Sequence, residues 1–174
     1  MTTQDQTKSI AGTRWQLDPT ASSAQFRVPH FWGLVKVKGH FANLDGWLEL
    51  DHDGTGKLEL TVDATSLATG NPRRDRHLRT SEFFDTERHP QVRFISARVG
   101  NPTDDKLSVA GQLQVAGKEV TLTLQPTIRQ TGERVHVDAT TTVDQRQLGM
   151  TWSPLGMTRT PTTLTVHAEL IPDS

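Results

Sequence analysis

Strict alternation of apolar and polar residues is the feature that most constrains how this chain folds. In residues 35–41, Val35, Val37 and Phe41 alternate with lysines and a histidine. The same period of two recurs in residues 26–30, 58–64, 107–115, 119–124, 135–143 and 164–170, and shorter candidates lie at 47–50 and 92–99. A two-residue period places successive side chains on opposite faces of a strand. We therefore predict an all-β fold whose strands each have one dry and one wet face.

Turn residues separate these segments, which indicates that consecutive strands run antiparallel. The turns are expected at Asp53-Gly54, Gly100-Asn101-Pro102, Ala116-Gly117 and Thr131-Gly132. Several strands are long, and long antiparallel strands joined in this way are typical of an up-and-down barrel or a strongly curved sandwich. Closure into a barrel also removes exposed strand edges. A chain of 174 residues suits one domain, so we expect a flexible N-terminal tail over 1–12 and a barrel domain over 13–174.

One segment breaks the alternation and is expected to be helical. Asn71 followed by Pro72 resembles an N-cap with proline at the first helical position, which predicts a short helix near residues 72–80. The aromatic pair Phe83-Phe84 follows it. We call residues 71–85 the flap, and we predict that the flap faces the second irregular stretch, 149–161, at the entrance of the barrel.

Composition excludes several classes of function. The formal net charge of -1 provides no basic field for nucleic acid, and the absence of cysteine removes disulfides, thiolate metal sites and cysteine nucleophiles. No run of about 18 apolar residues is present, so no membrane-spanning segment is expected. The polar first residues do not resemble a secretory signal, which makes the cytoplasm the expected location.

Specific motifs along nearly the whole chain are similar to those of one protein family. They are Trp15-Gln16-Leu17-Asp18-Pro19, Ala24–His30, Gly39-His40-Phe41, Ser66–Asn71, Arg74–Arg79, Phe83-Phe84-Asp85, His89-Pro90, Phe94-Ile95-Ser96 and Gly111–Lys118. On these residues the chain resembles the YceI-like family of lipocalin-like, polyisoprenoid-binding barrels. It departs from the family pattern at Leu148-Gly149, where a Phe-Gly pair is usual, and at Gln145, where an arginine is common.

The resemblance implies that the barrel holds an isoprenoid or another long apolar molecule. The chain would then be a lipid-binding or isoprenoid-binding carrier, storage or sequestering protein for a polyprenyl lipid or quinone, with ligand transport as one role and no other cofactor. Small inward residues support an open interior, and we expect Gly39, Ala64, Ser96, Gly111 and Ala139 to leave room along the axis. The residues predicted to contact the ligand are Phe26, Val28, His30, Trp32, Phe41, Leu60, Leu67, Arg74, His77, Leu78, Phe83, Phe84, Phe94, Leu113, Leu148, Met150, Trp152 and Met157.

The charged residues of the flap have two interpretations. Its arginines, among them Arg74 and Arg79, would suit an anionic head group, since guanidinium groups match phosphate oxygens. The structural alternative, which we favour, is that Asp75 pairs with a nearby arginine and His77 satisfies backbone groups, so that the flap is fixed. Phe83 and Phe84 are expected to divide two tasks, one lining the entrance and the other holding the helix in place.

No catalytic motif is recognisable, so a binding role is preferred to an enzymatic one. The alternative is a cyclase-like or isomerase-like enzyme that acts on a hydrophobic substrate in the same pocket, with His30 or His77 as acid or base. The histidines lack zinc-motif spacing, and we predict no metal, although a site of His30, His77 and His89 is the open alternative. His40, His136 and His167 fall on predicted outer faces. A homodimer is the default oligomer to consider.

Overall fold

The computed structural model describes residues 10–30, 35–53, 55–100, 107–148 and 161–173. They form one antiparallel sheet of twelve strands together with short helical segments. The strands are β1 (Arg14–Leu17), β2 (Ser23–His30), β3 (Val35–Phe41), β4 (Leu44–Leu50), β5 (Gly56–Asp63), β6 (Leu67–Ala68), β7 (Gln91–Gly100), β8 (Ser108–Val115), β9 (Lys118–Leu124), β10 (Thr127–Thr131), β11 (Arg134–Val143) and β12 (Thr162–Pro172). The helical segments are η1 (Ala64–Ser66), α2 (Pro72–Leu78) and η2 (Gln145–Leu148).

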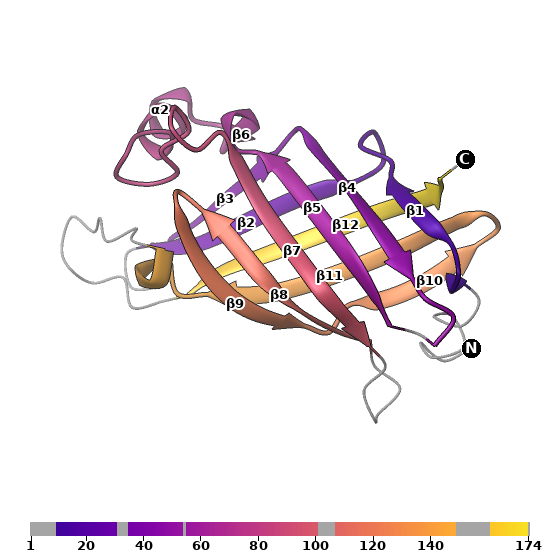
Figure 1. The fold of residues 1–174 in the computed structure, drawn as a ribbon. Helices are drawn as coiled ribbons and strands as arrows, with labels where there is room; N and C mark the ends of the chain where they lie inside the picture. The colour runs from indigo at the N-terminus through magenta and orange to yellow at the C-terminus, as the bar shows by residue number, and fades with distance from the viewer. Residues whose placement is uncertain (1–9, 31–34, 54, 101–106, 149–160, 174) are drawn as a thin grey trace.

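The C-terminal strand β12 is the junction of the sheet. Along one edge it pairs with β11, which in turn pairs with β10. Along the other edge, residues 163–167 pair with β2 and residues 170–172 pair with β1. From β2 the sheet continues through β3 to β6, and from β1 it continues through β4, β5, β7 and β8 to β9. The strand that ends the chain therefore joins both arms of the sheet (Figure 1).

The sheet curls into a barrel, as the alternation predicted. Buried side chains from all around the sheet form one hydrophobic core. In the described residues no hydrogen-bonded ladder joins β9 to β10 or β11. Instead, β9 approaches β11, and the two strands contribute Leu122, Leu124, Val137 and Ala139 to the lining of the same interior space. Apolar side chains of both strands thus face the same space at this seam.

The barrel begins earlier in the chain than residue 13. Ile10 is completely buried, and its carbonyl oxygen accepts a hydrogen bond from Nε1 of Trp15 at 3.1 Å. The amide of Gly12 donates to the carbonyl oxygen of Leu50 at 2.7 Å. Residues 10–12, expected to belong to a flexible tail, are therefore part of the folded barrel, because a large apolar side chain there has a place in the core.

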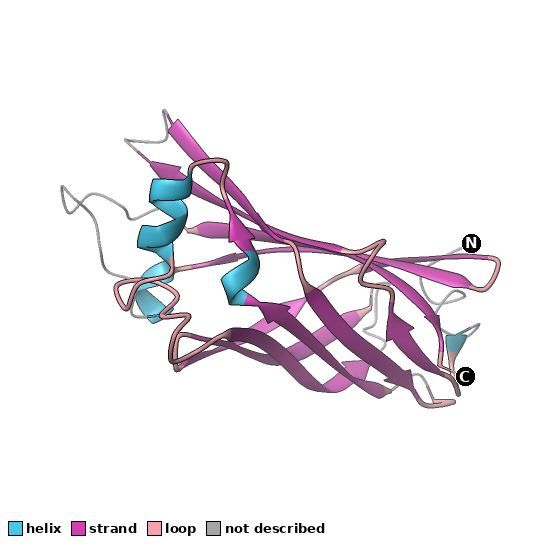
Figure 2. Ribbon diagram, turned by 90° about the horizontal axis from the view of Figure 1, so that it is seen from above, coloured by secondary structure: helices cyan, strands magenta, loops and turns pink. Residues whose placement is uncertain are grey.

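The predicted helix is present as α2, at one end of the barrel (Figures 1 and 2). The side chain of Asn71 accepts hydrogen bonds from the amides of Arg73 and Arg74, both at 3.1 Å, so the predicted N-cap is confirmed. Pro72 occupies the first turn, where its missing N–H costs nothing. Among the described residues, no helix combines the length and the apolar character that crossing a membrane requires.

Candidate functional site

An apolar cavity of about 160 Å³ lies inside the barrel. An apolar cavity of about this size stays dry and admits apolar guests. Strands β1, β4, β5, β7, β8, β9, β11 and β12 all contribute to the lining, which includes Leu17, Leu48, Leu58, Leu60, Phe94, Val109, Leu113, Leu122, Leu124, Pro126, Val137, Ala139, Thr141, Leu164, Val166, Ala168 and Leu170. Aliphatic side chains dominate this set. The space therefore suits an apolar guest surrounded by the barrel wall.

The register of β11 and β12 builds one wall of the cavity. Val137 lies opposite Ala168, Ala139 opposite Val166, and Thr141 opposite Leu164. All six line the cavity. The first two of these pairs each combine an alanine with a valine. Their side chains are small, so space remains on the inner side of this wall. The prediction that Ala139 leaves room is confirmed.

Gly39 and Gly111, also predicted to face inward, do not open space. A methyl group added to Gly39 would lie 2.2 Å from Cζ of Phe26, and one added to Gly111 would lie 2.7 Å from Cζ of Phe94. The expectation that these glycines leave room along the axis is wrong, because a phenylalanine ring already occupies the space beside each. Ser96 is buried for a different reason, since its hydroxyl donates to the carbonyl oxygen of Ala110 at 2.5 Å beside a bulge in the β7–β8 ladder.

Three aromatic rings fill the barrel end nearest the flap. The ring centres of Phe26 and Phe41 are 5.5 Å apart, those of Phe26 and Phe84 are 6.1 Å apart, and those of Phe41 and Phe84 are 5.7 Å apart. Tilted and edge-on rings at these separations attract one another beyond simple burial. Phe84 thus fastens the flap to β2 and β3. Phe83 instead meets the ring of His77 edge-on at 5.1 Å, and both phenylalanines pack against the core. That one of them lines an entrance stays a prediction.

The charged residues of the flap are largely engaged within the fold. Asp75 is buried and accepts hydrogen bonds from the amide of Thr69 at 2.9 Å and from its hydroxyl at 2.5 Å. Arg74 donates to the hydroxyl of Thr69 at 2.8 Å and to its carbonyl oxygen at 3.0 Å. Arg79 donates to the carbonyl oxygens of Leu67 and Thr65. These contacts favour the structural interpretation, with Thr69 rather than an arginine as the direct partner of Asp75.

The predicted ligand contacts are distributed between the cavity and its surroundings. Leu60, Phe94 and Leu113 line the cavity. Phe26, Phe41, Leu67 and Leu148 are buried in the core, against which Val28, Leu78, Phe83 and Phe84 pack. Arg74 and His77 belong to α2, where Nε2 of His77 lies 2.9 Å from Oε2 of Glu82. The side chain of His30 lies outside the described part of the structure, and so do residues Trp32, Met150, Trp152 and Met157.

Much of the cavity lining was absent from the predicted set. The C-terminal strand β12 and its neighbour β11 supply many lining residues, although none from either strand was predicted as a ligand contact. Their alternation had already assigned Val137, Ala139, Leu164 and Val166 to the inner face. That signal sufficed to find them. The family motifs instead drew the prediction toward the flap.

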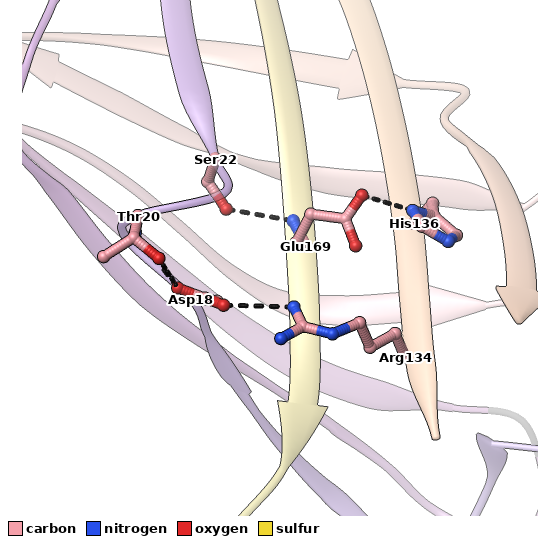
Figure 3. Close-up of polar contacts among 6 residues, drawn as sticks. All are labelled: Asp18, Thr20, Ser22, Arg134, His136 and Glu169. Atoms are coloured by element: carbon pink, nitrogen blue, oxygen red, sulfur yellow. Dashed lines mark hydrogen bonds and ion pairs between the residues drawn. The ribbon is translucent and has the colours of Figure 1, made fainter. Parts of the chain in front are cut away.

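Polar contacts on the outer face hold the cavity wall in place (Figure 3). Nη1 of Arg134 on β11 lies 3.0 Å from Oδ2 of Asp18, which follows β1. The hydroxyl of Thr20 and the Arg134 guanidinium both donate to Asp18 and hold the pKa of that carboxyl below its ordinary value. In a nearby residue pair of the β11–β12 ladder, Nδ1 of His136 contacts Oε1 of Glu169.

The outward histidines of this wall are paired with carboxylates. Besides the contact of His136 with Glu169, Nδ1 of His167 contacts Oδ1 of Asp138, which lies directly opposite it on β11. The outward orientation was predicted for both histidines, whereas their partners depend on strand register. In the described residues, no group of three His, Asp or Glu side chains is gathered where it could hold a metal ion.

A family model and a relative of known name both match most of this chain. The model of the YceI-like domain matches residues 15–170. Protein YceI of Escherichia coli O17:K52:H18 is 32% identical over 121 residues, a match that covers 67% of this chain and 62% of that protein. The chain therefore spans less than two thirds of the length of this relative.

Solved structures with the same fold are more distant in sequence. BcnA of Burkholderia cenocepacia superposes with a TM-score of 0.77 at 19% identity, covering 89% of this chain and 98% of that one. A polyisoprenoid-binding domain from Saccharophagus degradans superposes with a TM-score of 0.71 at 16% identity, covering 91% and 98%. These structures share the barrel architecture described above. The match of the family model over residues 15–170 shows that the chain belongs to the YceI-like family.

Proposed function

We propose that this protein binds a long apolar molecule, such as a polyisoprenoid, an isoprenoid quinone or a similar lipid, inside the barrel and serves as its carrier, store or sequestering protein. The observation that carries the proposal is the apolar cavity, which is lined by side chains from eight strands of the barrel. The resemblance to a domain described as polyisoprenoid-binding supports the same class of ligand.

The energetics of burial favour a long guest. Each methylene group transferred from water contributes about 0.8 kcal/mol, whereas association costs roughly 4–15 kcal/mol. A short chain would therefore gain little, while several prenyl units would exceed the cost. Tight binding then requires little polar recognition, in accord with a lining made mostly of leucine, valine and alanine.

The lining supports binding in preference to catalysis. Among the described lining residues, Glu59 is the one with an ionisable side chain. It alternates along β5 with the inward Leu58 and Leu60, and its carboxylate lies 2.6 Å from Nη2 of Arg93. The enzymatic alternative assigns acid or base chemistry to His30 or His77. His77 is on α2, away from the described cavity lining, and is engaged with Glu82.

The proposal is tested by filling the cavity. Native mass spectrometry and organic extraction of the purified chain should reveal a co-purifying apolar molecule, and a long-chain polyprenol or quinone should bind when added. Ala139→Phe places a ring in the cavity and should lower affinity at least tenfold. Thr140→Phe, on the outer face of the same strand, is the matched control and should bind normally. Failure of the wild-type protein to retain or bind either probe would refute the proposal.

A further inference from the structure

A second cavity, of about 300 Å³, opens on the outside of the barrel wall beside the tip of the β8–β9 hairpin. It is lined by residues 88–91, by Arg93 on β7 and by residues 114–119 of the hairpin. Figure 1 shows β7, β8 and β9 side by side in this part of the sheet. Arg93 and Gln114 lie opposite each other and alternate with Phe94 and Leu113, which line the interior cavity. The two cavities are therefore on opposite faces of the same wall.

Positive charge predominates in the outer pocket. Arg88 and Lys118 are both exposed, and neither has a carboxylate partner among the ion pairs of the described residues. Arg93 is already paired with Glu59. The one carboxylate in the lining, that of Glu119, accepts a hydrogen bond from Nε2 of Gln114 at 3.4 Å. Two cations thus remain available to a ligand.

The backbone fixes the walls of this pocket. The amides of Arg88 and His89 donate to the carbonyl oxygen of Asp85 at 3.1 and 2.8 Å, and the carbonyl oxygen of Pro90 accepts from the amide of Ala64 at 2.8 Å. Across the pocket, Ala116 and Gly117 form a tight hairpin turn with φ values of 50° and 75°. The turn rests close to His89, since a Cβ added to Gly117 would lie 3.0 Å from that ring.

We propose that this pocket binds an oxyanion of the phosphate class, either free in solution or as part of a lipid head group. A guanidinium and an ammonium group that line the same anchored pocket suit the several oxygens of such an anion. His89, Gln91 and Gln114 supply further polar atoms around it. The proposal does not rest on the interior ligand, because the pocket lies outside the wall.

The test removes the two cations and compares the result with a variant of equal charge. Binding of inorganic phosphate and pyrophosphate to the full chain is followed by amide NMR shifts of Gly117 and Lys118 and by calorimetry. In a second arm, the protein is sedimented with phosphatidylcholine vesicles that either contain or lack phosphatidylglycerol. The Arg88→Gln/Lys118→Gln variant is compared with Lys57→Gln/Arg129→Gln, which removes exposed cations on β5 and β10 that lie outside the pocket lining.

We expect the pocket variant to lose about tenfold or more in affinity, as the removal of charge-assisted hydrogen bonds implies, and the control variant to bind like the wild type. Loss confined to the soluble anions identifies a free phosphate compound as the ligand. Loss confined to phosphatidylglycerol vesicles identifies a lipid head group. The proposal is overturned if the wild type binds neither probe, or if both double variants lose affinity equally. Retention of an apolar molecule in the interior is scored separately and tests the proposed function alone.

Discussion

Two regions of the barrel interior share the same alternating strand pattern but differ in packing. At the flap end, the rings of Phe26, Phe41 and Phe84 meet one another and fill the space. Along the β11–β12 wall, Ala139 and Ala168 leave a cavity. Both regions consist of inward apolar side chains on alternating strands. Their difference shows that an apolar inner face does not by itself determine whether a barrel is filled or hollow.

The boundary between the two regions passes through the pairing of β2 with β12. Phe26 lies opposite Gly39 on one side and opposite Leu164 on the other. Its ring covers the glycine, whereas Leu164 belongs to the cavity lining. A small residue beside a ring therefore produces dense packing, while a small residue beside a valine leaves space.

Truncation of Phe26 should have the largest cost. Phe26→Ala removes a buried ring that contacts two others, and we expect it to lower the free energy of unfolding by about 3–5 kcal/mol. Leu164→Ala truncates its cross-strand neighbour in the partly open wall, where about 2 kcal/mol is expected. Urea denaturation of both variants provides the measurement. Equal losses would show that the two regions are packed alike.

The contact between Asp75 and Thr69 should have the next largest effect, and only on stability. Asp75→Ala leaves the amide and hydroxyl of Thr69 without their acceptor, which should cost about 1.5–3 kcal/mol. Because α2 does not contribute to the described cavity lining, affinity for an apolar probe should change little. Glu82→Ala, which breaks the exposed pair with His77, serves as the control and should change stability by less than about 1 kcal/mol. A large loss of affinity in Asp75→Ala would place the flap in the ligand site.

Filling the space beside the Phe26 ring should be unfavourable. Gly39→Ala places a methyl group 2.2 Å from Cζ of Phe26, and overpacking of this kind costs about 1–3 kcal/mol. Combining it with Phe26→Leu should recover part of the loss, because contacting residues couple. Gly100→Ala, where an added methyl group meets nothing within 4 Å, should be close to neutral. If Gly39→Ala were equally neutral, the flap end would have room to spare.

Strand faces and the helix start could be read directly from the sequence. Alternation identified the inner faces of β11 and β12, and Asn71-Pro72 identified the beginning of α2. Which small residues leave space could not be read, because the answer depends on which side chain lies across the sheet. Gly39 is opposite Phe26 and Ala139 is opposite Val166, and this register is set by the whole barrel.

The partners of polar side chains also depend on contacts between segments that are distant in the sequence. The sequence indicated that Asp75 had a structural role, but its partner proved to be Thr69, six positions away and outside the helix. His136 and His167 were correctly predicted to face outward, yet their carboxylate partners come from the neighbouring strand. Local pattern fixes the face on which a side chain lies. Contacts across strands depend on the strand registers, which are set only when the whole barrel forms.

Two aspartates, one beside the cavity wall and one near the flap, should have the smallest effects on stability. Asp18 supports the cavity wall through Thr20 and Arg134, and Asp63 caps η1 near the flap through Thr65. The pKa of each carboxyl is lowered in the folded state, mainly by the threonine hydroxyl that donates to it. Each therefore stabilises the fold above its unfolded pKa of about 3.9, and loses that contribution as pH falls through the lower folded value.

Asp18→Asn and Asp63→Asn should each make the stability of the fold less dependent on pH below about pH 4. The stability lost in the two variants should differ in its dependence on salt. The ion pair with Arg134 makes part of the Asp18 contribution electrostatic, and such surface interactions weaken as salt screens them. Thr65 is neutral, so the contribution of Asp63 should persist in high salt. Thermal unfolding between pH 2 and 6, at low and high salt, measures both effects. If the stability lost in Asp18→Asn and the stability lost in Asp63→Asn depended equally on salt, Arg134 would not stabilise the cavity wall through Asp18. The hydrogen bond from a threonine would then explain the contribution of both aspartates.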